Sequence, residues 1–287
     1  MLYRNLRMKK PSTVIVASSH VSAGAVGGRV SGFVLESLGF RVVAVPTVLL
    51  SWHPGVGPST RVVPDRFADV LVDLAGAPWL ADVAAVLSGY LGEPDQAAAV
   101  ASLVGAVRLA NPDTVYVCDP VIGDIGGLYV PAATAHAIRE RLVPLADVIT
   151  PNVAELAWLS SRASGPTDIG AARTAATALG VRETVVTSLS AGTGRTGAAV
   201  FSAPESRIAS HPELPGETRG AGDLFAARYL AARLAGDDTP VALRCAAAAT
   251  FAFVTAAQAS DDGALPLAGN AALLSGGLED VALAEPR

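Results

Sequence analysis

Short apolar runs rich in β-branched residues alternate with longer segments of helical periodicity along most of the chain. The apolar runs predict strands at residues 13–18, 41–45, 83–88, 114–118, 147–150 and 184–188. The periodic segments predict helices at residues 24–38, 64–74, 95–110, 131–142, 152–160, 167–179, 222–235 and 240–259. This alternation predicts an α/β fold in which helices cover both faces of a mostly parallel sheet. Strands buried on both faces read as continuous apolar runs, as these do.

The rest of the chain adds little regular structure to this prediction. Residues 197–202 and 206–210 are predicted to form a hairpin or meander, and residues 47–51 a short further strand or loop. No internal repeat or linker is visible, so we predict one domain over residues 1–287. We expect a loose lead-in at residues 1–11 and an irregular tail at residues 260–287. Hydrophobic residues make up 51% of the chain, which is sufficient for a large core.

Charge and composition exclude several classes of protein. The formal net charge is −5, which argues against nucleic acid as a main partner because phosphate binding needs a basic face. The apolar stretches are shorter than the roughly 20 residues of a membrane span, and the first one is too short for a signal sequence. We therefore expect a cytoplasmic protein with no membrane partner. Cys118 and Cys245 are expected to be buried free thiols.

Small or polar residues follow almost every predicted strand. In open α/β sheets, ligands bind at the carboxyl ends of the strands. The residues at these ends are Ser18-Ser19-His20, Ser51-Trp52-His53, Ser88-Gly89-Tyr90, Asp119-Pro120, Thr150-Pro151-Asn152 and Thr187-Ser188. A purely structural rim would be less uniform, so this edge of the sheet is the candidate site.

The most informative motif is Gly220-Ala221-Gly222-Asp223, which opens a strongly helical segment. Glycine lets the backbone approach an anion closely, and a helix N-terminus directs N–H groups and partial positive charge at the same point. Asp223 at that terminus could take a proton from an alcohol, as phosphoryl transfer requires. Taken alone, the motif slightly favours a plain helix N-cap that follows a glycine turn.

Two further signals lie at neighbouring strand ends. Asn152 opens a helix and Glu155 follows three residues later, a spacing that is also typical of a capping box. Asp119 directly follows the strand at residues 114–118, where a lone aspartate is usually a turn former. Neither signal alone distinguishes a structural role from a functional one.

Together, the three motifs resemble the ribokinase superfamily, and within it the pyridoxal kinases. The resemblance covers most of the chain and is most specific in the strings S-G-Y-L-G at residues 88–92 and C-D-P-V-I-G-D at residues 118–124. It implies a ribokinase-like fold and ATP-dependent phosphorylation of the 5′-hydroxymethyl group of a B6 vitamer. A Walker A motif is absent from the sequence, which fits a superfamily that holds phosphate with the G-A-G-D loop.

The resemblance also implies roles for individual residues. Asp223 would be the catalytic base and would contact the vitamer, and the N–H groups of Gly220, Ala221 and Gly222 would hold the γ-phosphate. Asp119 and Glu155 would bind Mg²⁺ through water. The residues implied on the ATP side are Asp119, Thr150, Asn152, Glu155, Thr187 and Ser188, and those on the vitamer side are Ser19, His53, Pro54, Gly55 and Tyr90. A monovalent cation such as K⁺ and a homodimer are further implications.

Some positions depart from the family pattern and leave alternatives open. The loop at residues 22–28 has unusually small side chains, and Pro54 replaces a residue with a hydroxyl group. Arg219 precedes the G-A-G-D motif, where an apolar residue or proline is common. Ser188 replaces a lysine seen in some relatives. These departures bear on vitamer preference and turnover. A hydroxymethylpyrimidine kinase of the same fold is one alternative, although that family often has cysteine where Asp223 stands. A non-catalytic protein that binds B6 vitamers is the other.

Overall fold

One large sheet organises the part of the chain that this computed structural model describes, which is residues 12–202, 206–216, 218–259 and 263–285. Its ten strands lie in the order β12-β11-β10-β9-β8-β5-β4-β1-β2-β3. Their bounds are β1 Thr13–Ala23, β2 Arg41–Trp52, β3 Arg61–Val62, β4 Val83–Ser88, β5 Val115–Cys118, β8 Val148–Ile149, β9 Glu183–Ser190, β10 Arg195–Phe201, β11 Ser206–Pro212 and β12 Ala282–Ala284. A separate hairpin pairs β6, Gly123–Asp124, with β7, Gly127–Leu128.

The centre of the sheet is parallel and its two margins are antiparallel. The ladders β2–β1, β1–β4, β4–β5, β5–β8 and β8–β9 are all parallel. β3 pairs antiparallel with β2 at one margin, and β10, β11 and β12 continue antiparallel from β9 at the other. Short loops join β2 to β3 and β9 to β10, whereas each parallel pair needs a crossover, and β12 reaches β11 only after α7 and α8. The predicted mostly parallel sheet is confirmed.

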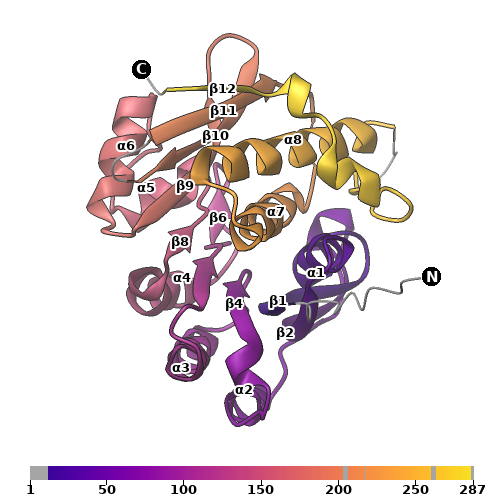
Figure 1. Cartoon of the computed structure of the whole chain (residues 1–287), viewed down its shortest axis with the longest axis vertical. Coiled ribbons are helices and arrows are strands. Elements are labelled where there is room, and N and C mark those ends of the chain that lie inside the picture. Colours follow the sequence, from indigo (N-terminus) through magenta and orange to yellow (C-terminus); the bar gives the residue numbers. More distant parts are fainter. Residues whose placement is uncertain (1–11, 203–205, 217, 260–262, 286–287) are drawn as a thin grey trace, which may run out of the picture.

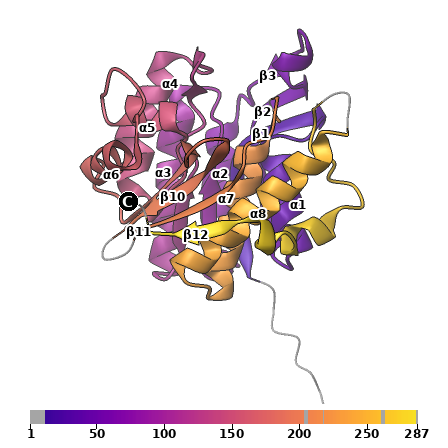
Figure 2. The ribbon, with the colours of Figure 1, turned by 90° about the horizontal axis from the view of Figure 1, so that it is seen from above.

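Helices cover both faces of this sheet, as Figures 1 and 2 show. One face carries α1 Gly28–Ser37, α7 Ala221–Ala235 and α8 Thr239–Ala257. The other carries α2 Phe67–Ala75, α3 Pro94–Ala110, α4 Ala132–Ala137, α5 Val153–Leu159 and α6 Ile169–Ala178. Along β1, Val14 and Val16 pack toward the first group while Ile15 and Ala17 pack toward the second. This alternation follows from the two-residue period of a strand.

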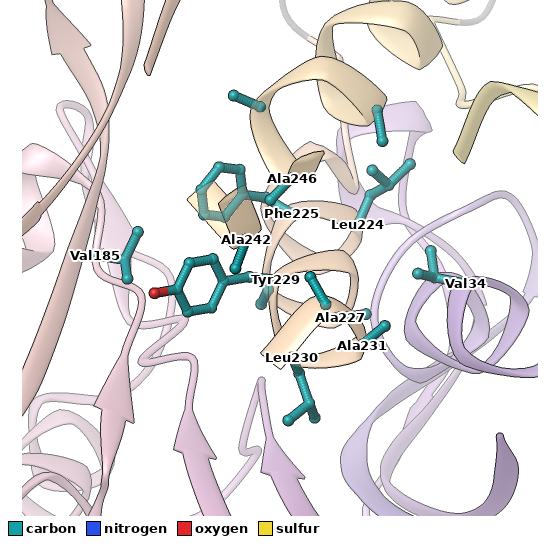
Figure 3. Close-up of a cluster of buried hydrophobic side chains, with 14 of the residues drawn as sticks. Val34, Val185, Leu224, Phe225, Ala227, Tyr229, Leu230, Ala231, Ala242 and Ala246 are labelled. Carbon is teal, nitrogen blue, oxygen red and sulfur yellow. The ribbon is translucent and has the colours of Figure 1, made fainter. Parts of the chain in front are cut away.

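Small residues allow α7 to approach its neighbours closely. Ala227 and Ala231 lie on the side of α7 that faces Val34 of α1 (Figure 3). Tyr229 extends from the other side of α7 toward Val185 of β9 (Figure 3). The Tyr229 hydroxyl donates to the buried Glu183 carboxylate over 2.6 Å, so this tyrosine fixes the distance between helix and sheet. Packing on two sides holds α7 in place, and with it the motif at its N-terminus.

The alanine-rich helix α8 is long enough and apolar enough to cross a membrane. Helices in the core of a folded domain often have the same length and composition. α8 packs against α7 and β11, and its buried residues Leu243, Ala246 and Phe253 belong to the main hydrophobic cluster.

Four sequence-based expectations need correction. The tail is not irregular: its described part contains 3₁₀ turns at Ala271–Ser275 and Leu278–Asp280 and the edge strand β12. The first helix begins at Gly28 rather than residue 24, because Gly27 adopts φ 62°. Residues 41–52 form one continuous strand instead of two, and α7 starts at Ala221, with Gly220 as its left-handed N-cap. The expected loose lead-in at residues 1–11 lies outside the described residues.

Candidate active site

Asp223 lies where the β1–α1 loop meets the start of α7. The Gly27 N–H donates to Oδ2 of Asp223 over 2.8 Å, across 196 positions of sequence. This contact needs glycine at residue 27: φ is +62°, and a Cβ there would lie 2.4 Å from both the backbone oxygen and Oγ of Ser19. The small loop at residues 22–28 therefore packs against Ser19 and presents an N–H group to the carboxylate.

The Gly220-Ala221-Gly222 loop forms the first turn of α7. Gly220 has φ +85°, and a Cβ on it would lie 2.1 Å from the backbone oxygen of Ala25, so the two loops pack backbone to backbone. The first helical hydrogen bond in this turn runs from Leu224 N to Gly220 O. The N–H groups before it have no partner within the helix and form the anion-binding end of α7.

The environment of Asp223 suits a base that works near neutral pH. Burial raises the pKa of Asp223 to about 6, while the hydrogen bonds from Gly27 N–H and from its own N–H oppose that rise. The residue as a whole is only partly buried. Gly89 borders it at the end of β4: a Cβ on Gly89 would lie 3.9 Å from Asp223 Oδ1 and 2.5 Å from Ser18 Oγ.

A second carboxylate, Asp119, follows β5 and is 6% exposed. Thr150 Oγ1, at the end of β8, donates to Asp119 Oδ1 over 2.8 Å. Burial raises the pKa of Asp119 to about 7, and the negative charge of Asp223 adds to the rise. The ends of β5 and β8 thus bring Asp119 and Thr150 together, close enough to Asp223 for its charge to raise the pKa of Asp119.

Glu155 accepts hydrogen bonds from two loops of the site. Its Oε1 accepts from Ile122 N over 3.0 Å, and its Oε2 accepts from Asn152 N over 2.8 Å. Burial, and then the charge of Asp119, raise the pKa of Glu155 to about 8, although the backbone N–H groups counteract both. These bonds leave Glu155 less able than Asp119 to bind a metal directly. Its contacts fit a role that is exerted through water or through the loop it holds.

Asn152 completes the capping box and connects two parts of the site. Its side-chain oxygen accepts from the N–H groups of Ala154 and Glu155, and its Nδ2 donates to Gly123 O over 2.9 Å. Asn152 also forms an isolated parallel bridge with Thr187 of β9. The cap that the spacing alone predicted is therefore present, and it lies on the predicted ATP side. Ser188 follows with φ +58° and is exposed.

The donor set on this side is compatible with Mg²⁺. Among the described residues, no group of three His, Cys, Asp or Glu side chains could hold a metal ion on its own. Mg²⁺ typically takes one or two carboxylates and completes its shell with water and substrate phosphate. Asp119 raises the pKa of Glu155 through its charge, and a nearby cation would relieve the repulsion between the two. Asp119 is the carboxylate with free acceptor capacity.

The predicted vitamer-side residues come from three segments of the chain. Ser19 is buried within β1 against Gly27, the residue whose N–H donates to Asp223. After β2, Pro54–Val56 form a 3₁₀ turn that His53 caps, and His53 Nδ1 accepts from Gly55 N over 3.0 Å. Tyr90 is half-buried after β4, and its backbone oxygen accepts from Thr47 Oγ1. The 53–55 turn is joined to the rest of the site through Arg219.

Sequence reasoning missed two contributors to the site. One is Gly27, whose N–H donates to Asp223; the small loop at residues 22–28 carried no signal for a contact across 196 positions of sequence. The other is Arg219, whose Nη2 donates to Gly55 O over 3.2 Å. Arg219 was noted only as a departure from the family pattern, and only the fold shows what it contacts.

Comparison with known proteins places this site in a family. The family model described as phosphomethylpyrimidine kinase matches residues 76–268. A pyridoxal kinase of Granulibacter bethesdensis is 36% identical over 251 residues, covering 83% of this chain and 87% of that protein. A pyridoxine/pyridoxal/pyridoxamine kinase of Bordetella bronchiseptica is 37% identical over 270 residues, covering 90% of this chain and 94% of its own.

The chain belongs to the pyridoxal kinase family. Its fold agrees with solved kinases: pyridoxal kinase from Leishmania donovani in complex with ADP and pyridoxamine superposes with a TM-score of 0.85 at 28% identity, covering 96% of this chain and 99% of that one. The expected ribokinase-like fold and kinase class are therefore confirmed.

Proposed function

We propose that this kinase transfers the γ-phosphoryl group of ATP to the 5′-hydroxymethyl group of a B6 vitamer, with Asp223 as the base. The observation that carries the proposal is the meeting of a carboxylate of raised pKa with the amide-rich N-terminus of α7. The carboxylate of Asp223 accepts the hydroxyl proton as the oxygen attacks phosphorus. The bond from phosphorus to the bridging oxygen breaks, and ADP leaves with that oxygen.

The loop Gly220-Ala221-Gly222 stabilises the charge that develops on the transferred group. Its N–H groups lie at the positive end of a helix of 15 residues. Donors fixed in the folded protein need no rearrangement as the reaction proceeds, which is the main source of such stabilisation. The close packing of Gly220 against Ala25 holds the loop in this arrangement.

The ATP side is proposed to include Asp119, Thr150, Asn152, Glu155, Thr187 and Ser188, and the vitamer side Ser19, His53, Pro54, Gly55 and Tyr90. Asp119 would hold Mg²⁺ together with the ATP phosphates, and Glu155 would act through water and through the loop at Ile122. Bound Mg²⁺ would supply positive charge to the phosphates. A monovalent cation such as K⁺, a homodimer and a cytoplasmic location are parts of the same proposal.

A steady-state assay tests the proposal and its competitor. Pyridoxal, pyridoxine, pyridoxamine and hydroxymethylpyrimidine are each supplied with ATP and Mg²⁺, and ADP release is measured together with the phosphorylated product. The name of the matched family model makes the pyrimidine the relevant competitor. We expect turnover with at least one B6 vitamer to exceed turnover with the pyrimidine. A preference for the pyrimidine, or binding of vitamers without ADP release, would contradict the proposal.

A further inference from the structure

Arg219 spans the gap between the phosphate loop and the turn that follows β2. It directly precedes Gly220, yet its Nη2 donates to the backbone oxygen of Gly55, 164 positions earlier. A Cβ on Gly55 would lie 2.6 Å from Nε, 2.8 Å from Nη2 and 2.9 Å from Cζ of Arg219. The guanidinium therefore lies directly against Gly55, and the absence of a side chain at residue 55 is what admits it.

The backbone N–H of Gly55 determines which ring nitrogen of His53 carries the proton. The Gly55 N–H donates to Nδ1 of His53 over 3.0 Å. Because Nδ1 accepts this bond, a neutral imidazole must carry its proton on Nε2. Burial, and then the positive charge of Arg219, lower the pKa of His53, so the ring is neutral at neutral pH. Nε2–H is then a fixed donor for an acceptor oxygen.

We propose that Arg219 is a positioning residue that clamps the turn at residues 53–57 to the phosphate loop and so holds His53 as an Nε2–H donor to an oxygen on the vitamer ring. This inference rests on the proposed function, because it assigns the ring to the His53 side of the site. It also gives a role to the one residue of the phosphate loop region that departs from the family pattern.

The turn lies at the margin of the sheet, where such a clamp can act. The turn at residues 53–57 leaves the sheet after β2, and β3 beyond it is a two-residue edge strand. Its internal bonds, such as Trp52 Nε1 to Gly57 O, stiffen the turn but do not fix it to α7. The contact from Arg219 to Gly55 ties the turn to the helix that carries Asp223. Recognition of the ring and transfer of phosphate are thereby held in one geometry.

Kinetics of two variants test the clamp. Arg219→Leu removes the donor, and Gly55→Ala pushes the guanidinium away while keeping its charge. We expect Arg219→Leu to raise the KM for pyridoxal about tenfold, as loss of a charged hydrogen bond would. The KM for ATP should remain unchanged, Arg219→Lys should recover part of the loss, and Gly55→Ala should change the KM for pyridoxal in the same direction as Arg219→Leu. Arg66→Leu, an exposed arginine that pairs with Asp69, is the matched control and should behave as wild type.

A second measurement needs no substrate. ¹⁵N NMR of the histidines in the free, full-length protein reports which ring nitrogen of His53 is protonated. We expect Nε2–H in the wild type and a mixture of tautomers in Arg219→Leu, with His53→Gln used to assign the signal. An unchanged tautomer, or an unchanged KM for pyridoxal, overturns the proposal. So does a rise confined to the KM for ATP, which would make Arg219 a phosphate ligand. If wild type phosphorylates no vitamer, the proposed function fails, and the NMR result still decides the clamp.

Discussion

Replacing Asp223 with asparagine should damage catalysis and stabilise the fold at the same time. Asparagine keeps the size of the side chain and an oxygen that can accept from Gly27 N–H, so the local structure should survive. What is lost is the base. Removing a general base typically costs about 10²–10⁴ in rate, and we expect kcat for pyridoxal to fall by that amount while the vitamer still binds.

The gain in stability follows from the raised pKa of Asp223. Its pKa rises from 3.8 to about 6 on folding, a difference that corresponds to at most about 3 kcal/mol. Because the folded pKa is the higher one, the carboxyl favours folding fully below pH 3.8, and this contribution disappears as the pH rises through about 6. Above that pH the ionised Asp223 destabilises the protein. Its partial accessibility to solvent reduces the effect below the upper figure.

Denaturant unfolding at two pH values separates this reasoning from a general effect of the substitution. At pH 8 we expect Asp223→Asn to raise the free energy of unfolding by about 1–3 kcal/mol. Near pH 4 the gain should largely disappear, since Asp223 is then protonated in the folded wild type. Asp95→Asn, an exposed aspartate in the first turn of α3, is the matched control and should change neither stability nor turnover appreciably. A destabilised Asp223→Asn variant at pH 8, or one with wild-type turnover, would refute the argument.

Three further predictions concern the surroundings of Asp223. The value of kcat/KM for pyridoxal should rise with pH through about 6, because the base must be deprotonated; a profile flat from pH 5 to 8 would count against Asp223. Gly27→Ala should lower kcat at least about tenfold, since φ is +62° and its Cβ would overlap Ser19; a folded variant with full activity, checked by thermal melting, would contradict this. Glu155→Gln should raise the Mg²⁺ concentration needed for half-maximal rate, because the uncharged amide attracts the cation less and its NH₂ group cannot accept from Asn152 N or Ile122 N as a carboxylate oxygen does; wild-type metal dependence would remove Glu155 from the metal site.

Much of the fold could be predicted because parallel strands and their covering helices have distinct periodicities. Predictions failed where a local signal had two meanings. The predicted strand at residues 41–45 stopped before Pro46, yet β2 continues through it: β3 pairs only with Leu49 and Leu50, so no ladder on that edge needs an N–H at residue 46. The C-terminal strand β12 has three exposed residues, and its pairing with β11 leaves no pattern in its composition.

The candidate site could be predicted only as far as its motifs are local. Asn152 and Glu155 stand three residues apart, so their capping box was visible in the sequence and is present in the structure.

The state of Asp223 depends instead on Gly27 and on the neighbouring strand ends, which the fold brings together from distant positions. A carboxylate at a helix start is a cap when solvent surrounds it and a base when burial raises its pKa. The sequence is compatible with a cap and with a base, and the packing of the 22–28 loop against α7 favours the base. Enlarging that loop at Gly27 should therefore change the chemistry of Asp223 before it changes the fold.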